Sequence, residues 1–269
     1  MSHISFSELK EWAECPWKHK LNYIDKIKQF KGNEYTAFGT SLHTVCEALT
    51  HNDNTDGFDW STYDARSHFE EEFLNNLRSL KKVDPDITLD QNIVEKMRSQ
   101  GKYITQFILP ALKRYFGDFK LVEVEEALYE PIGDKEEQFK GYIDLVIRTT
   151  KDNKYHIIDW KTCSWGWDNR KKTDKMTTYQ LTLYKHFWCK KHDIDYNNVI
   201  THFALLKRTA KKNNVEIFKV SSGVKKIENA LKLLNKALYN INKNAYIKNR
   251  LACHGKFGTC VYYKTDYCM

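Results

Sequence analysis

The sequence predicts an α/β fold, with helices on the faces of a central β-sheet. Residues up to about 118 contain several helical stretches, and three strand-like stretches follow between residues 119 and 161. A helix, two more strands and a last helix then extend to about residue 244. A chain in which strands and helices alternate in this way folds as a sheet that buries its faces against helices.

The amino-terminal region is predicted to be helical. Ser5-Phe6-Ser7-Glu8 is a capping-box pattern, so a helix is expected to start there. Residues 38–50 are predicted to form a second helix, since Leu42 and Val45 share one face, and His43 lies at the edge of that face. A polar loop at 52–59 and two further helices at about 61–80 and 90–116 complete the region.

The strands begin at residue 119. Residues 119–130 alternate, with Val122, Val124, Glu126 and Leu128 on one face, and a glutamate on an apolar face requires an explanation. Strands are then expected at 139–148 and 155–161, a helix from about 174 to 191, strands near 199–208 and 215–220, and a helix near 224–244.

Composition limits the class of protein. The 269 residues are 41% hydrophobic, enough for one large domain or a core with a small satellite, and the net charge of +8 favours a polyanionic partner. Met1-Ser2-His3 does not begin a signal peptide, and no apolar run is long enough to span a membrane. Seven cysteines are an odd number for a disulfide scaffold. We therefore expect a protein of the reducing cytoplasm without membrane association.

One pattern of charged residues indicates chemistry. Asp144 lies within an apolar strand, and Asp159 and Lys161 end the next one. Residues two apart in a strand project from the same face, so Asp159 and Lys161 point together and a neighbouring strand can bring Asp144 beside them. Two carboxylates suit Mg²⁺ or Mn²⁺, and the lysine can orient water or stabilise charge on a phosphate. An ordinary strand pair with a salt bridge remains the alternative.

The ordered set of motifs resembles the PD-(D/E)XK nuclease superfamily, in particular its RecB/Cas4-like exonuclease branch, which includes viral and phage proteins. Gly141-Tyr142-Ile143-Asp144 and Ile158-Asp159-Trp160-Lys161-Thr162 match its central strands. Gly39 to His43 matches a Gly-x-x-x-His helix, Gln180 to Tyr184 matches a Gln-x-x-x-Tyr helix, and Ser7 to Pro16 resembles an amino-terminal segment that ends in Cys-Pro.

The resemblance implies a restriction-endonuclease-like fold, in which helices flank a central mixed sheet. It also implies that His43, Asp144, Asp159 and the main-chain carbonyl of Trp160 bind Mg²⁺ or Mn²⁺. Glu126 lies where such proteins often carry a glutamate, and Gln180 and Tyr184 are expected over the active site. Glu126, Gln180 and Tyr184 are therefore predicted to join Asp144, Asp159 and Lys161 in catalysis.

The cysteines fall into two groups. Cys15, Cys253, Cys260 and Cys268 offer four thiolates, which suit a [4Fe–4S] cluster or a structural zinc ion. In the resembled branch this one-plus-three arrangement holds a [4Fe–4S] cluster, although the Cys-x6-Cys-x7-Cys spacing here is looser than usual. The other cysteines, at positions 46, 163 and 189, are expected to be small buried hydrophobes.

Basic and aromatic residues gather after two strands. Arg170, Lys171 and Lys172 follow the lysine strand, close to Trp165 and Trp167. A second basic run, containing Lys207, Arg208, Lys211 and Lys212, follows the fourth strand. A charge run is commonly just a solvated face, but aromatics beside cations suit single-stranded nucleic acid, where bases stack and phosphates pair with cations.

These observations predict a metal-dependent DNA exonuclease that acts on single-stranded or frayed ends in recombination, repair or end processing. Two alternatives are a DNA-binding module without turnover and a nuclease subunit of a larger helicase or integrase assembly; homo-oligomers are a further expectation. We expect three regions: a helical region at 1–118, the nuclease core at 119–244 and a Cys-rich lobe at 245–269. A viral protein would work in the host cytoplasm.

Overall fold

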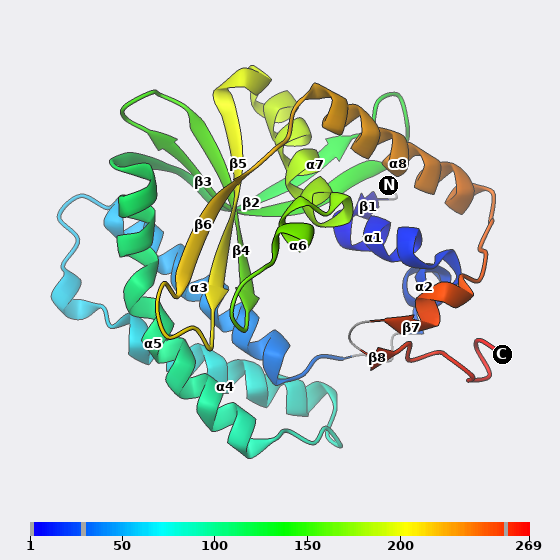
Figure 1. The fold of residues 1–269 in the computed structure, drawn as a ribbon, viewed down its shortest axis with the longest axis horizontal. Coiled ribbons are helices and arrows are strands. Elements are labelled where there is room, and N and C mark those ends of the chain that lie inside the picture. Colours follow the sequence, from blue (N-terminus) through cyan, green and yellow to red (C-terminus); the bar gives the residue numbers. More distant parts are fainter. Residues whose placement is uncertain (1–2, 28–30, 256–257) are drawn as a thin grey trace. The chain divides into compact units, whose positions relative to one another are not determined.

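The computed structural model describes residues 3–27, 31–255 and 258–269 (Figure 1). They form two compact units. Unit 1 draws on residues 1–31, 129–141 and 223–269, and unit 2 on residues 32–128 and 142–222. The units cut across the expected boundaries at 118 and 244: the helical region packs with the core strands in unit 2, while Cys15 shares unit 1 with the carboxy-terminal segment.

Unit 2 contains a mixed sheet. Strand β3 (Gln138–Thr149), which crosses from unit 1, pairs antiparallel with β4 (Tyr155–Cys163) through residues 145–148. β4 pairs parallel with β5 (Val199–Lys207), and β5 pairs antiparallel with β6 (Val215–Val220). β2 (Phe119–Pro131) also pairs with β3. The expected α/β class with a central mixed sheet is confirmed.

Three long helices pack together beside this sheet (Figure 1). They are α3 (Glu34–Asp53), α4 (Ala65–Val83) and α5 (Gln91–Phe116). Phe38, Phe69 and Phe73 from α3 and α4 form a buried cluster that continues into Trp160 of β4 and Leu206 of β5. α7 (Lys175–His192) packs against β4 and β5, and the short α6 (Asn169–Thr173) precedes it. Single 3-10 turns occupy 60–62 and 196–198.

Strand β2 departs from the expected alternation. Leu121 and Val124 both pack against the core, although an unbroken alternation would place them on opposite faces. Two exposed residues lie between them, and Glu125 has a φ of 48°, in the left-handed region. Such an irregularity re-aims the following side chains, as a β-bulge does. This irregularity determines which side of the sheet the carboxylates of Glu125 and Glu126 face.

Unit 1 brings together segments from both ends of the sequence. β1 (His3–Ser5) pairs parallel with residues 138–140 of β3. α1 (Phe6–Glu14) begins at Ser5, whose hydroxyl accepts a hydrogen bond from the amide of Glu8 at 3.2 Å, and it packs against α8 (Val224–Asn242). α2 (Pro16–His19) continues into a π-helical turn at 20–24. A 3-10 turn (Arg250–Cys253) leads into the hairpin β7 (His254–Gly255) and β8 (Gly258–Thr259).

Among the described residues, no helix is both long and apolar enough to cross a membrane.

Candidate active site and cysteine cavity

The two aspartates meet where β3 and β4 separate. The antiparallel pairing ends at Leu145 and Ile158, so Asp144 and Asp159 lie just beyond the last paired residues of their strands. The amide of Trp160 donates a hydrogen bond to Oδ2 of Asp144 at 2.7 Å. The structure therefore places the two carboxylates close together, in the arrangement that the sequence predicts.

Both carboxylates are buried. Asp144 is 9% exposed and Asp159 only 1%. Burial, together with the charge of Asp159, raises the pKa of Asp144 well above its ordinary value. Nζ of Lys161 lies 2.5 Å from Oδ2 of Asp159, but this oxygen is in hydrogen-bond geometry with no described group. Two buried carboxylates beside one lysine leave negative charge that a bound cation would neutralise.

His43 faces this pair from α3. Its Nδ1 lies 3.6 Å from Oδ2 of Asp144. Burial lowers the pKa of His43 to about 4, although Asp159 and a hydrogen bond with the main chain of Trp160 oppose the shift. The imidazole is therefore neutral near pH 7 and retains a lone pair, the form in which histidine binds metals.

Glu125 is a site residue that the sequence reasoning did not identify. Ligand atoms of His43, Glu125 and Asp144 all lie within 4.8 Å of one another, a spacing suited to one metal ion. Glu47, one helical turn after His43, contacts the Glu125 carboxylate, and burial together with that contact raises the pKa of Glu47 to about 7. The His43-x-x-x-Glu47 spacing was a usable signal, because residues four apart share a helix face.

Glu126 lies elsewhere, contrary to the expectation that it joins the catalytic carboxylates. It is 6% exposed and accepts hydrogen bonds from Nε1 of Trp188 at 2.6 Å, Nζ of Lys191 at 2.9 Å and Nε2 of His192 at 2.6 Å. The left-handed backbone at Glu125 explains why Glu125, and not Glu126, lies with His43 and Asp144. The side chain of Glu126, the next residue, points towards α7 instead. Glu126 therefore joins β2 to α7.

Gln180 and Tyr184 are close to the aspartates. Nε2 of Gln180 donates to the Tyr184 hydroxyl at 3.2 Å. Tyr184 is 6% exposed, and burial and the neighbouring Asp159 raise its pKa. The Tyr184 hydroxyl also has a hydrogen bond with the main chain of Tyr142, two residues before Asp144. The Gln-x-x-x-Tyr helix thus lies beside the point where β3 and β4 separate, as the resemblance implies. We call this point, with Asp144 and Asp159, the fork.

The predicted nucleic-acid contacts differ in exposure. Trp165 is 78% exposed. Trp167 packs on Phe203, and Nζ of Lys171 lies over the Trp167 ring, 4.4 Å from its centroid. Lys172 forms a salt bridge with Glu216 at 2.5 Å, which reduces the positive charge available for a phosphate. The remaining exposed cations of this group are Arg170 and Lys171.

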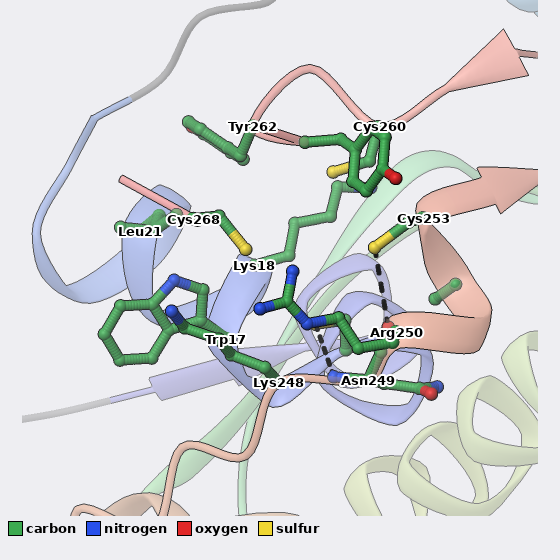
Figure 2. Close-up of a pocket in the computed structure, with 13 residues that line it drawn as sticks. Trp17, Lys18, Leu21, Lys248, Asn249, Arg250, Cys253, Cys260, Tyr262 and Cys268 are labelled. Carbon is green, nitrogen blue, oxygen red and sulfur yellow. Dashed lines mark hydrogen bonds between the residues drawn. The ribbon is translucent and has the colours of Figure 1, made fainter. Parts of the chain in front are cut away.

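The four cysteines Cys15, Cys253, Cys260 and Cys268 line one cavity in unit 1 (Figure 2), with about 380 Å³ of space that is partly open to solvent. All four are free thiols. The pKa of Cys253 is raised, first by burial and then by the neighbouring thiols. Lys18, Lys248 and Arg250 also line the cavity, although Lys18 forms a salt bridge with Glu11 at 3.1 Å.

The hairpin β7–β8 explains the six-residue gap between the first two carboxy-terminal cysteines. His254 pairs with Thr259, and Gly255 with Gly258. The amide of Cys260 then donates to the carbonyl of Cys253 at 2.8 Å, so the two cysteines are neighbours across the ribbon. From the other end of the chain, Cys15 receives a hydrogen bond at its sulfur from the amide of Asn249 at 3.4 Å.

A mixed sheet that carries paired carboxylates and an adjacent lysine is typical of enzymes that cleave phosphodiester bonds. The chain belongs to the PD-(D/E)XK nuclease superfamily, whose family model matches residues 3–265. Its fold is also similar to a crystal structure from Eubacterium rectale described as a "putative exonuclease", with a TM-score of 0.52 and 12% identity over 93% of this chain and 84% of that chain. The protein is therefore a nuclease by family.

Proposed function

We propose that this protein is a metal-dependent DNA exonuclease of the RecB/Cas4-like kind. The observation that carries the proposal is the convergence of His43, Glu125 and Asp144 within 4.8 Å, beside the buried Asp159 and Lys161. One imidazole and several carboxylates form a donor set for Mg²⁺ or Mn²⁺. The buried carboxylate of Asp159, which lies beside Lys161, adds a further oxygen donor to this set. The carbonyl of Trp160 stays a candidate for a further ligand.

The side chains have distinct roles in this proposal. A divalent cation bound here would supply the positive charge that phosphodiester cleavage requires. Asp144, Asp159, Glu125 and His43 hold and orient it. Lys161, which projects from the same strand face as Asp159, positions the attacking water or stabilises the charge that develops on the phosphate. Gln180 and Tyr184 contribute hydrogen-bonding groups beside the fork.

Substitution at the fork tests the catalytic proposal. Asp159→Ala should abolish cleavage of end-labelled DNA in Mg²⁺ or Mn²⁺, while Lys161→Ala should slow cleavage by about 10²-fold or more at nearly unchanged metal affinity, the loss expected for one group that stabilises transition-state charge. Circular dichroism and DNA binding should be largely retained. Full activity of the Asp159→Ala protein would overturn the assignment, and a wild-type protein that binds DNA but never cuts it would favour a binding module.

We propose single-stranded or frayed ends as the substrate, because cations and an exposed indole lie after the catalytic strand. Arg170, Lys171 and Trp165 are the candidate DNA contacts, and the ring of Trp167 lies under Nζ of Lys171. The salt bridge of Lys172 with Glu216 makes Lys172 a weaker candidate. A linear single strand should be degraded much faster than closed circular duplex. Equal rates on the two would exclude an exonuclease. Helicase or integrase partners and homo-oligomers remain alternatives that cofractionation and light scattering would test.

We also propose that the cysteine cavity holds a [4Fe–4S] cluster. Four thiols from the two ends of the chain line one cavity, and four thiolates suit a [4Fe–4S] cluster, with a tetrahedral zinc ion as the alternative. The cations that line the cavity would offset the negative charge of either centre.

The visible spectrum distinguishes the two centres. Anaerobically purified protein should be brown and contain about four iron atoms per chain if the cluster is present. A colourless protein with one zinc ion would replace the cluster by the zinc alternative. Protein with neither metal would remove this part of the proposal and leave the proposal for the carboxylate site unchanged.

A further inference from the structure

Arg208, directly after β5, is held in place by two uncharged neighbours. Its guanidinium carbon lies 5.4 Å from the ring centroid of Tyr35, in the first turn of α3. Its Nη1 donates to Oε1 of Gln100, on α5, at 2.9 Å. Stacking on an aromatic ring and a hydrogen bond to an amide orient the planar guanidinium before any ligand arrives. Less side-chain entropy is then lost on binding.

The charge of Arg208 differs from that of its neighbour in the same basic run. Lys207 is 6% exposed and its Nζ lies 3.0 Å from Oε2 of Glu216, so an adjacent carboxylate offsets its charge. The recorded partners of Arg208 are neutral. Its positive charge and its remaining N–H groups are therefore available to an oxyanion.

The position of Arg208 follows from the register of the sheet. β4 and β5 run parallel, with Lys161 opposite Leu205 and Cys163 opposite Lys207. The amide of Arg208 donates to the carbonyl of Cys163 at 2.8 Å. Arg208 thus lies about three residues beyond Lys161, or about 10 Å along the sheet at about 3.3 Å per residue. Because the offset of three residues is odd, the side chains of Arg208 and Lys161 leave opposite faces of the sheet, and Arg208 lies on the face covered by α3 and α5. A phosphate bound by Arg208 would therefore not be the scissile one.

An exposed aromatic residue emerges at the same place. The amide and the hydroxyl of Thr209 both donate to the carbonyl of Ser164, at 2.8 and 3.0 Å. These bonds fix the start of the loop that carries Trp165, whose side chain is 78% exposed. A fixed guanidinium next to a free indole matches a nucleotide whose phosphate is paired and whose base is unstacked.

We propose that Arg208, positioned by Tyr35 and Gln100, binds a backbone phosphate of single-stranded DNA other than the scissile phosphate, while Trp165 stacks on a base of the same strand. This inference rests on the proposed nuclease function and assigns one phosphate contact within it. Tyr35 and Gln100 are positioning residues.

Neutral phosphate substitutions locate the contact. A set of fluorescent oligonucleotides, each with one methylphosphonate, would be titrated against the full-length protein in Ca²⁺, with cleavage of the unmodified strand followed separately in Mg²⁺. In the wild-type protein, one or two adjacent positions should weaken binding by about tenfold, the scale for losing a charge-assisted hydrogen bond. Arg208→Ala should weaken binding of the unmodified strand by the same factor and abolish the penalty at those positions only.

Matched variants separate this contact from general charge. Arg78 is a control, because its guanidinium also has one neutral partner, Asn75 at 2.9 Å, but no aromatic platform. Arg78→Ala should leave the methylphosphonate profile unchanged. Arg208→Lys keeps the charge but loses the planar fork, and Gln100→Ala keeps the arginine but loosens it; both should give intermediate affinities. Arg208→Ala should also reduce the slope of log Kd against log salt by about 0.7, the value for one phosphate contact on a single strand.

Two results would overturn the proposal. One is unchanged affinity and an unchanged methylphosphonate profile in folded Arg208→Ala protein. The other is equal loss on blunt duplex and single strand in both Arg208→Ala and Trp165→Ala, which would remove the single-strand assignment. Failure of the nuclease function would appear differently, as no cleavage by the wild-type protein in Mg²⁺ together with an intact methylphosphonate profile.

Discussion

At the scale of single residues, two adjacent glutamates have different tasks. Glu125 lies with His43 and Asp144, whereas Glu126 accepts three hydrogen bonds on the side of α7. Glu125→Gln should weaken Mn²⁺ binding at least tenfold and reduce cleavage, because an amide is a poorer ligand than a carboxylate. Calorimetric titration with Mn²⁺ measures the affinity.

Glu126→Gln is the matched control. It should leave Mn²⁺ affinity unchanged but lower the free energy of unfolding by about 1–2 kcal/mol, since a buried carboxylate loses its charge-assisted bonds while Lys191 and His192 are partly solvated. If Glu126→Gln lost the metal and Glu125→Gln retained it, the two assignments would have to be exchanged.

This pair also shows where sequence reasoning stops. Asp144, Asp159 and Lys161 could be predicted because strand periodicity alone places i and i+2 together. Glu126 was chosen over Glu125 because the alternation was assumed to run unbroken. The left-handed φ of Glu125 depends on the surrounding packing, and no residue type in β2 announces it. The role of Glu47 likewise depends on the contact of α3 with β2.

At the scale of elements, β4 and β5 each contribute one histidine to a buried pair. Nδ1 of His156 lies 3.0 Å from Nε2 of His202, and Nε2 of His156 lies 3.2 Å from the hydroxyl of Thr149. That hydroxyl donates to a neighbouring oxygen, so His156 must donate to it and accept from His202. Nδ1 of His202 is then a buried acceptor without a partner among the described residues. Both rings are neutral in this arrangement.

The pair should make stability depend on pH. Burial lowers the pKa of His156 to about 4, and burial with the charges of His156 and Lys219 lowers that of His202 to about 3. In the unfolded chain both titrate near 6.5, so the unfolded state binds more protons between about pH 6.5 and pH 4. The stabilising contribution is therefore complete above pH 6.5 and is lost as pH falls towards 4.

Urea unfolding at a series of pH values measures this. Between pH 7 and pH 4.5, the wild-type protein should lose on the order of 5 kcal/mol of unfolding free energy through this pair, and residual structure in the unfolded state would reduce that loss. The variant with both His156→Leu and His202→Leu should show a clearly flatter dependence, while His43 and His186, whose pKa values are also lowered to about 4, still contribute. Equal slopes in the two proteins would contradict the pairing.

The long elements were predictable and the short ones were not. Helices expected at 38–50, 61–80 and 90–116 are found at 34–53, 65–83 and 91–116, and the strand at 215–220 matches at both ends. Their own periodicity specifies them. β1 and the π-helical turn at 20–24 are a few residues each and contact partners distant in the sequence, whereas the hairpin β7–β8 is local but too short to show a periodicity. His156 and His202 could not be paired for the same reason, because the register of β4 and β5 is not encoded within either strand.

At the scale of the whole molecule, the family match over residues 3–265 covers both compact units. Unit 2 contains the proposed carboxylate site, and unit 1 contains all four cavity cysteines. The two proposed centres thus belong to different units of the chain. Loss of one centre should therefore leave the other formed, as the sequence also predicts for loss of a cysteine thiolate.

The cysteine centre should act as a crosslink of unit 1. Apart from it, a small buried cluster of Leu21, Tyr262 and Cys268 anchors the last residues, together with hydrogen bonds such as those from the amide of Trp17 to the carbonyl of Ile247 at 3.2 Å and from its indole to the carbonyl of Tyr267 at 2.9 Å. A centre that joins Cys15 to Cys268 closes a loop of most of the chain and restricts the unfolded state.

Cys268→Ser should therefore bleach the visible spectrum and make the segment 245–269 the first site of protease cleavage. Cys163→Ser, a half-buried thiol of unit 2, should change neither. Mn²⁺ affinity at the carboxylate site should remain within about twofold of wild type in both variants, since no residue of the cysteine cavity belongs to the unit that contains the carboxylate site. Retention of a full-strength iron–sulfur spectrum in Cys268→Ser would remove that thiolate from the centre, and collapse of Mn²⁺ binding together with the spectrum would show that the two units do not form independently.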